Sequence, residues 1–401
     1  MELYFISKEN KMKTRKCTLI FIICYLSYTS IYIARLNLSM ASPGLIDAQI
    51  LDTAQVGMMG SIFSIIYSIG RLLNGQLSDR LSPWIMISIG LILAGISNIF
   101  IGFFPPFAGI LLLWGTNAFA QSMLWSSILC TIAELYDEET ARKKTSYMVT
   151  SVAVGNIAGI IINTFIINRF GLAFAFIIPG GLTLLFSTLV LLTMRKKKTT
   201  QAAVRNHISM TRLLQNKSIQ LSLTPAILHG TMKDNISLWM TVYFVDRFNI
   251  NLNQSAYFVL LIPTMGFIGR MLYPACYKLC KGDEHKVSFY AFLLCVAAAL
   301  ILGFGTNSPL FSAVCLSLIY TAVSIINTSF LSIYPIRFVH TGNVASVSGI
   351  MDFATYFGAG VSSLFYGFII EKAGYSPMYF SWAAFSLISI FFLRVLFSEK
   401  R

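Results

Sequence analysis

The segment IYIARLNLS at residues 31–39 places a charged side chain, Arg35, inside an apolar run that extends from residue 17 to residue 45. A run of that length is typical of a helix that crosses a membrane. A charge at the centre of such a helix costs on the order of 2.5–3.5 kcal/mol on insertion scales, so it usually faces a cavity and marks a substrate path. Tyr32, Arg35 and Ser39 recur at spacings of three and four residues and share one helix face. We expect that face to line a polar cavity.

The composition of the whole chain indicates a membrane protein. Of 401 residues, 56% are hydrophobic and 11% are charged, and the mean hydropathy of +0.71 is too high for a water-soluble surface. Since one span takes about 20 apolar residues, the length accommodates roughly a dozen helices. We therefore predict an all-α protein, embedded in a lipid bilayer, with twelve transmembrane helices. The expected helices cover residues 17–45, 54–78, 84–103, 106–134, 145–168, 170–194, 219–246, 254–280, 286–304, 308–337, 342–370 and 375–397.

The distribution of basic residues predicts the orientation. The chain has 30 Lys and Arg against 16 Asp and Glu, a net charge of +14, and cytoplasmic loops are the ones enriched in Lys and Arg. With the N-terminus inside, the only basic residues expected on the outer side are Arg169, Arg247 and Lys372. We expect both termini in the cytoplasm, a location in the cell membrane and no nucleic-acid partner, because topology accounts for the positive charge.

A basic segment, residues 195–218, divides the chain into two groups of six predicted helices. We assign residues 1–16 to a cytoplasmic N-terminus, 17–194 to a first bundle, 195–218 to a central cytoplasmic loop, and 219–401 to a second bundle with a short tail. The first apolar run lacks a small-residue cleavage site and is predicted to be an uncleaved span.

The two halves are related in sequence. Residues RLNLS at 35–39 match KDNIS at 233–237 at an offset of 198, and Gly70-Arg71 matches Gly269-Arg270 at an offset of 199. Such matches indicate a duplicated unit, and repeats of this kind place the substrate site near the bilayer midplane between the halves. A monomer is then sufficient, because one chain supplies both walls of the site.

Arg35 and Lys233 are the cations that this duplication relates to each other. Arg35 offers paired donors that suit phosphate oxygens, and Lys233 shares a helix face with His229 at a four-residue spacing. We predict that both cations bind a dianion. In the alternative, Arg35 pairs with Asp234 or Asp352 and only holds helices together.

Other polar residues within the predicted helices have open roles. Asp352 could neutralise Lys233 in the empty site or carry a proton. Arg71 and Arg270 lie near the cytoplasmic helix ends and are expected to reach the interface or to bond to the opposite half.

Asn156 and Asn327 could bond a substrate hydroxyl or only hold helices together. No His or Cys cluster has the spacing of a metal site, and no glycine-rich loop with a lysine could cradle phosphates. We expect neither an enzyme, nor a metal, nor a cofactor.

The sequence GQLSDR at residues 75–80 resembles the loop signature of the major facilitator superfamily, a glycine three residues before an Asp-Arg pair. The resemblance implies two pseudo-symmetric six-helix bundles, with Asp79 and Arg80 acting in a gate. Ser82 and Pro83 depart from the pattern, since a further glycine and basic residues are usual there.

A finer resemblance is to the organophosphate:phosphate antiporters, which exchange glycerol-3-phosphate or hexose-6-phosphate for phosphate. YIARLN at residues 32–37 is similar to their Tyr-x-x-Arg-x-Asn pattern, and Lys233 with Trp239 is similar to their basic residue and tryptophan at the same interval. The glycerol-3-phosphate branch has arginine where Lys233 stands and histidine where Gly155 stands. From spacing and resemblance together, the predicted substrate-binding residues are Arg35, Lys233, Tyr32, His229, Trp125, Trp239, Asn156 and Asn327. The predicted coupling and gating residues are Asp352, Asp234, Asp79 and Arg80.

These features predict a secondary active transporter that moves a small organic anion by alternating access, with a phosphate ester exchanged for inorganic phosphate as the favoured mode. Asp234 and Asp352 leave open a proton-coupled symporter of another small anionic metabolite. A membrane sensor that binds the anion without moving it is the third alternative.

Overall fold

The computed structural model describes residues 2–78, 81–194, 213–341 and 344–399, which are almost entirely helical and contain no strand. Its elements are α1 (Glu2–Asp47), α2 (Thr53–Ser78), α3 (Pro83–Ile101), α4 (Phe107–Ser122), α5 (Leu124–Leu135), α6 (Glu138–Phe170), α7 (Phe174–Met194), α9 (Lys217–Phe248), α10 (Leu252–Leu279), α11 (Glu284–Gly303), α12 (Pro309–Thr328), the π-helical η1 (Ser329–Ile333), the 3-10 helix η2 (Tyr334–Thr341), α13 (Val344–Ala373) and α14 (Ser376–Glu399). The predicted loop at 195–218 and the predicted gate residues Asp79 and Arg80 lie largely or wholly outside the described residues.

Eleven helical segments among the described residues are long and apolar enough to cross a membrane. α9 is the twelfth long helix, and its middle carries the polar run Lys233-Asp234-Asn235, which lowers its hydropathy. The predicted set of twelve helices is confirmed, with α4 and α5 together forming the fourth predicted helix. Polar residues in a membrane helix need polar surroundings, and Lys233 and Asp234 line a cavity.

The predicted helix starts are wrong at α1 and α6. α1 begins at Glu2 and not near residue 17, and α6 begins at Glu138 and not near residue 145. Asp137 caps α6, since its side chain accepts a hydrogen bond from the backbone N–H of Thr140, and such caps stabilise a helix start. Hydropathy predicts only the apolar part of a helix, so these charged first turns were missed.

Two predicted helices are interrupted. The predicted helix at 106–134 breaks at Met123, between α4 and α5. The predicted helix at 308–337 passes from α12 into η1 and then η2, which contains Pro335. Proline has no backbone N–H and cannot continue an α-helical hydrogen-bond pattern.

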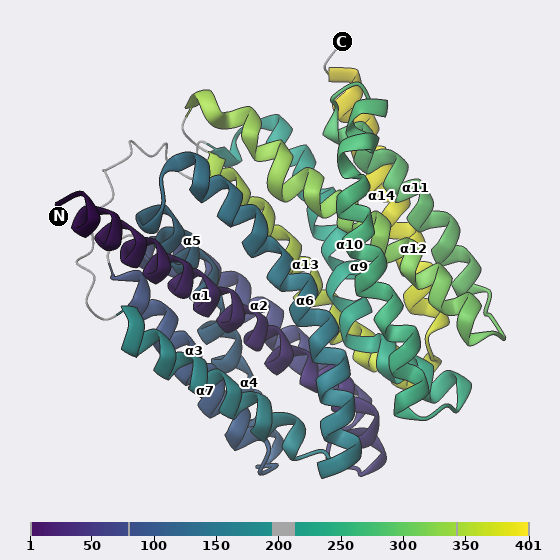
Figure 1. Cartoon of the computed structure of the whole chain (residues 1–401). Coiled ribbons are helices and arrows are strands. Elements are labelled where there is room, and N and C mark those ends of the chain that lie inside the picture. The colour runs from purple at the N-terminus through teal and green to yellow at the C-terminus, as the bar shows by residue number, and fades with distance from the viewer. Residues whose placement is uncertain (1, 79–80, 195–212, 342–343, 400–401) are drawn as a thin grey trace.

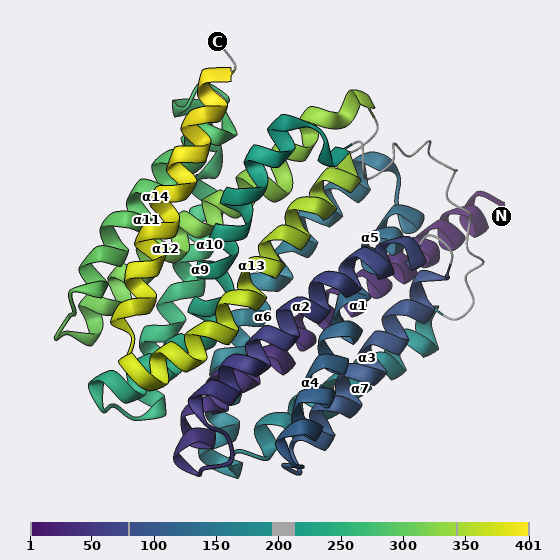
Figure 2. The same cartoon turned by 180° about the vertical axis from the view of Figure 1, so that it is seen from behind.

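The helices form two bundles, α1–α7 and α9–α14, that meet along their inner faces (Figures 1 and 2). In both views α2 and α13 lie side by side at the junction of the bundles. They approach closely because both carry glycine there: a Cβ on Gly57 would lie only 2.7 Å from the Cα of Gly367. α1 contacts α9 as well, where the Ser39 hydroxyl donates to the Leu238 carbonyl at 3.1 Å. The α2–α13 and α1–α9 contacts join the two halves.

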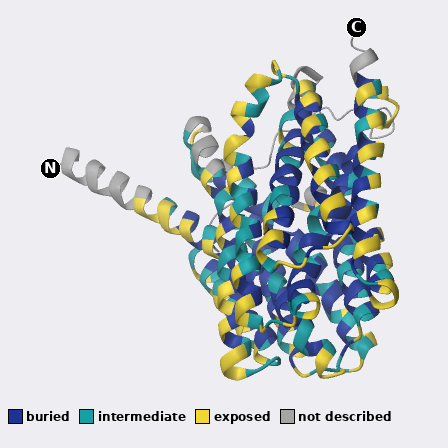
Figure 3. Ribbon diagram, turned by 90° about the vertical axis from the view of Figure 1, so that its right-hand side faces the viewer, coloured by how far each residue is buried: buried dark blue, intermediate teal, exposed yellow. Residues whose placement is uncertain are grey.

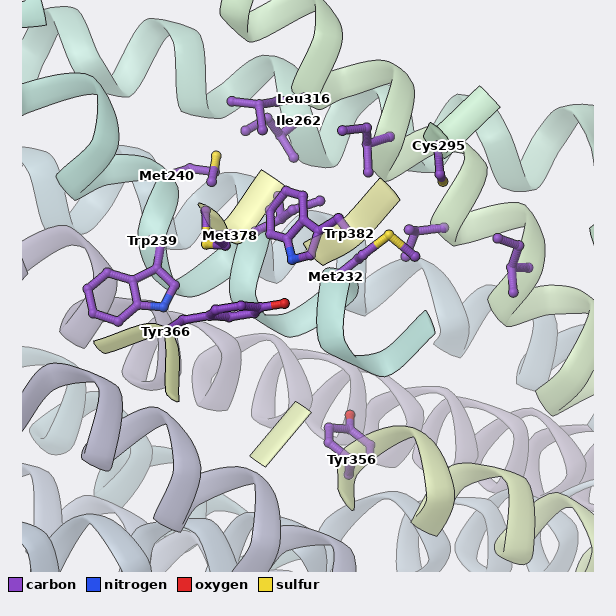
Figure 4. Packing of buried hydrophobic residues seen from close by; sticks show 14 of the residues in the cluster. Met232, Trp239, Met240, Ile262, Cys295, Leu316, Tyr356, Tyr366, Met378 and Trp382 are labelled. Carbon is purple, nitrogen blue, oxygen red and sulfur yellow. The ribbon is translucent and has the colours of Figure 1, made fainter. Parts of the chain in front are cut away.

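Apolar side chains cover the outside of the bundles. Exposed residues lie mostly on the outer surfaces and at the helix ends (Figure 3), and they include Leu112 and Leu192, which are 73% and 77% exposed. An apolar outer surface is the one that a lipid bilayer solvates. Inside the second bundle, Trp239, Tyr366 and Trp382 belong to one buried cluster (Figure 4).

Candidate substrate-binding site

A cavity of about 470 Å³ lies between the two bundles, within the size range of small-molecule sites. Helices α1, α2, α4, α5 and α6 supply one wall, and α9, α10, α12, η1 and α13 supply the other. Most of the predicted site residues line it: Tyr32, Arg35, Trp125, Asn156, Lys233 and Asn327, with Asp234 and Asp352. The face of the first helix that carries Tyr32, Arg35 and Ser39 therefore lines a cavity between the halves, as predicted.

Arg35 is surrounded by aromatic rings. Its guanidinium carbon lies 4.5 Å from the ring centroid of Phe63, 5.3 Å from that of Tyr67 and 5.8 Å from that of Tyr356. Cation–π contacts of this kind hold a guanidinium without neutralising its charge. Within the described part of the chain, Arg35 forms neither an ion pair nor a hydrogen bond, so the alternative pairing with Asp234 or Asp352 is absent.

Lys233 has a counter-ion next to it in the sequence. Its Nζ lies 3.5 Å from the Oδ1 of Asp234 and 4.4 Å from the ring centroid of Tyr356. The ring of Tyr356 thus contacts both Lys233 and Arg35. The second oxygen of Asp234 is buried without a hydrogen-bond partner among the described residues. Lys233 contributes less net charge to the cavity than Arg35 does.

An ion pair joins the two halves beside the cavity. The Nη2 and Nε of Arg71, on α2, lie 2.9 and 3.0 Å from the Oδ2 of Asp352, on α13. Arg71 was expected either to reach the membrane interface or to bond to the opposite half, and in the structure it bonds to the opposite half. One of the two possibilities for Asp352 was to neutralise Lys233 in the empty site; in the structure Asp352 pairs with Arg71 instead.

Aromatic side chains form the wall next to Arg35. The ring centroid of Tyr28 lies 5.0 Å from that of Trp125 and 5.5 Å from that of Tyr32. α6 packs tightly here, since a Cβ on Gly155 would lie 2.6 Å from the Cβ of Tyr32. The space beside Tyr32 leaves no room for a larger residue at 155.

Two predicted substrate-binding residues do not line the cavity. His229 and Trp239 are fully buried, and Trp239 packs among the apolar residues of the second bundle (Figure 4). The Nδ1 of His229 lies 3.3 Å from the Ala226 carbonyl of its own helix. His229 lies one helical turn before Lys233 on the same face of α9, but it is fully buried and does not line the cavity.

Other polar residues form hydrogen bonds between helices within each half. The repeat-related Asn37 and Asn235 are both buried: Asn37 donates to Asn98 at 2.7 Å, and Asn235 donates to Ser362 at 2.8 Å. Asn163 donates to the Ile33 carbonyl and holds α6 to α1. These amides are packing residues, which was the alternative interpretation of such side chains.

Arg270 and Tyr356 are cavity residues that sequence reasoning missed. Signals for both were present, since Arg270 repeats Arg71 and Tyr356 follows Asp352 by one helical turn. Asn327 lines the cavity as predicted, and its Oδ1 is buried without a hydrogen-bond partner in the described residues.

One group of side chains elsewhere has the geometry of metal ligands. Ligand atoms of Asp283, Glu284 and His285 lie within 4.8 Å of one another. Arg337 already occupies these carboxylates, since its Nη2 lies 2.8 Å from the Oε2 of Glu284, and the His285 ring contacts Ser222 at 3.3 Å. The group is an ion-pair network in the second half.

Known proteins with similar sequences are membrane carriers or sensors. A Chlamydia trachomatis protein named "Probable hexose phosphate transport protein" is 32% identical over 161 residues, 40% of this chain and 35% of that protein. The phosphoglycerate transporter protein of Salmonella typhimurium is 23% identical over 88% of this chain and 82% of its own. A membrane sensor protein of the same organism is 33% identical, over 25% of this chain and 23% of its own length. The match to the Chlamydia trachomatis protein thus spans about a third of that protein's length.

Fold and family follow from two further matches. The crystal structure of the nucleoside transporter NupG superimposes with a TM-score of 0.75 at 15% identity, covering 96% of this chain and 98% of that one. At that identity the likeness shows the fold alone. Residues 21–363 match the Major Facilitator Superfamily. Because that match covers most of the sequence, the chain belongs to the Major Facilitator Superfamily.

Proposed function

We propose that the protein is a secondary active transporter of phosphate esters and that it exchanges them for inorganic phosphate by alternating access. The observation that supports this best is Arg35, a guanidinium in the wall of the cavity between the halves with only aromatic rings around it. Its planar donors match two phosphate oxygens at once. The names of the relatives, which mention hexose phosphate and phosphoglycerate, agree with such a ligand.

Charge balance favours exchange over one-way transport. Four cations and two carboxylates line the cavity, and Arg71–Asp352 and Lys233–Asp234 are pairs. The wall therefore keeps two uncompensated positive charges when no ligand is bound. Closing a cavity around like charges is unfavourable in a medium of low effective dielectric, whereas a bound dianion neutralises them. An anion is then needed in both directions of the cycle.

The same residues suggest how binding is coupled to movement. The Arg71–Asp352 ion pair joins α2 to α13 at 2.9 Å. It has to break or rearrange if these two helices separate during the transport cycle. We assign a coupling role to Asp352 and to Asp234, and a gating role to Asp79 and Arg80.

We place both termini on the cytoplasmic side of the cell membrane, as the basic residues indicate, and we propose that the monomer is the working unit.

Counterflow in proteoliposomes tests the proposal. Vesicles containing the full chain and loaded with unlabelled phosphate should accumulate labelled phosphate, and glycerol-3-phosphate or glucose-6-phosphate should compete. Glycerol and glucose are the matched controls, because they lack only the phosphoryl group. Uptake that follows an imposed proton gradient and ignores trapped phosphate would show that the protein is a proton-coupled carrier.

A sensor is the second candidate, because one relative is named a membrane sensor protein. Such a protein would bind phosphate esters through the same cavity and would not carry them. Saturable binding of labelled phosphate to the purified protein, together with no counterflow in vesicles that hold correctly inserted protein, would favour the sensor.

A further inference from the structure

Among the described residues, Arg270 is a second cation in the cavity without a counter-ion. It projects from α10 into the wall that also contains Tyr320, Asn327 and Ser348. In the described ranges of the chain, no carboxylate pairs with it and no hydrogen bond fixes it. The aromatic rings that surround Arg35 are not near Arg270 either: the cation–π contacts of the cavity belong to Arg35, Arg71 and Lys233.

The repeat-related arginine has the opposite environment. Arg71 occupies the equivalent place on α2 and is neutralised across the halves by Asp352 of α13. Arg270 stands at the corresponding junction of α10 with α6, which the Asn168–Asn253 hydrogen bond of 2.6 Å ties together at one end. After Glu139, α6 contains no Asp or Glu as far as its end at Phe170. The counterpart of Asp352 is therefore missing.

A partly buried guanidinium without a counter-ion has a chemical consequence. It cannot lose its proton in a protein, so its charge must be satisfied by water or by an anion from the ligand. The phosphoryl group of a ligand can be bound at Arg35, in the aromatic part of the cavity. A ligand that also carries a second acidic group can then place that group at Arg270.

We propose that Arg270 forms a second anion subsite and that the cavity is built for phosphate esters that also carry a carboxylate. This inference rests on the proposed function, and it adds the class of substrate. Arg270 binds the carboxylate through charge-assisted hydrogen bonds. Asn327 lines the same wall of the cavity.

Two ligands that differ in one group test the proposal. 3-Phosphoglycerate has a carboxylate where glycerol-3-phosphate has a hydroxymethyl group, and their phosphoryl groups are alike. Competition against labelled phosphate should show that the wild-type protein prefers 3-phosphoglycerate by at least about tenfold, equivalent to ~1.4 kcal/mol. Arg270→Gln should reduce the ratio of the two affinities to about one, and Arg270→Lys should restore part of it, since a charge remains.

Lys278→Gln is the matched control, because Lys278 is an exposed cation on the same helix and does not line the cavity. It should leave the ratio of affinities as in the wild type. The inference is wrong if the wild-type protein binds both ligands equally, or if Arg270→Gln keeps the preference. If neither ligand nor phosphate binds the wild-type protein, the proposed function fails first. The wild-type ratio decides the matter even if an Arg270 variant does not fold.

Discussion

Arg35 on α1 and Lys233 on α9 occupy equivalent places in the two halves, but their surroundings differ. Arg35 is held by the rings of Phe63 and Tyr67 and keeps its full charge. Lys233 lies 3.5 Å from a carboxylate oxygen of Asp234. Duplication placed a cation on each side of the cavity, and a single neighbouring residue then made the two sides unequal. We infer that Arg35 binds the phosphoryl group and that the Lys233–Asp234 pair adjusts the charge of the cavity.

Removing Arg35 should have the largest effect, because Arg71, the other guanidinium that the first half places in the cavity wall, is already paired with Asp352. We expect Arg35→Gln to weaken phosphate binding by at least about a hundredfold, and Arg35→Lys nearly as much, since lysine lacks the planar fork. The measurement is competition binding on purified, monodisperse protein. Arg247→Gln is the control, since Arg247 is exposed at the end of α9. Retained affinity in Arg35→Lys would return Arg35 to a packing role.

Removing Lys233 should have a smaller effect that a second substitution can reverse. Lys233→Ala leaves Asp234 unpaired in the cavity wall, so phosphate affinity should fall by at least about tenfold. Adding Asp234→Asn should recover much of this loss, because it removes the repulsive charge. Equal losses in the single and double variants would mean that Lys233 contacts the ligand directly, as Arg35 is proposed to do.

Asp352→Asn should change affinity little and pH dependence more. The substitution frees Arg71 and adds one positive charge to the cavity, so phosphate affinity should rise by about two- to fivefold. The double variant Arg71→Gln, Asp352→Asn should return it to the wild-type value. Exchange measured across a pH series tests the coupling role: identical profiles for the wild type and Asp352→Asn would exclude Asp352 as the proton carrier.

The smallest effect on binding is expected at Trp239, which is buried outside the cavity. Trp239→Phe should lower the thermal midpoint, at a cost of about 1–3 kcal/mol in stability, and phosphate affinity should stay as in the wild type. Trp125→Phe is the comparison, because Trp125 lines the cavity. A selective loss of affinity in Trp239→Phe would place that residue in the binding site after all.

The fold was predictable from local pattern. Hydropathy is summed along the chain, and in a bilayer each apolar segment of sufficient length has to satisfy its own backbone hydrogen bonds as a helix. The number of spans and the division into related halves therefore emerged without tertiary information. The charged first turns of α1 and α6 and the breaks at Met123 and in η2 did not, because hydropathy does not register caps or local backbone geometry.

The candidate site was predictable in part. Arg35 was recognisable because a charge in an apolar helix is costly unless a cavity receives it. His229 was assigned to the site by its spacing from Lys233 and Trp239 by the family resemblance, and both lie in the core. Helix rotation decides which side of a helix faces a cavity, and packing against the neighbouring helices sets that rotation.

The chain alone established where the charges are, and the three-dimensional structure established which of them are compensated. Asp234 follows Lys233 directly, and that pairing is local. The bond between Arg71 and Asp352 joins residues 281 positions apart. Arg270 has no counter-ion among the described residues, since α6 carries no acid after Glu139. Whether a charge is available to a ligand depends on what the opposite half presents, and only the packing of the two halves determines that.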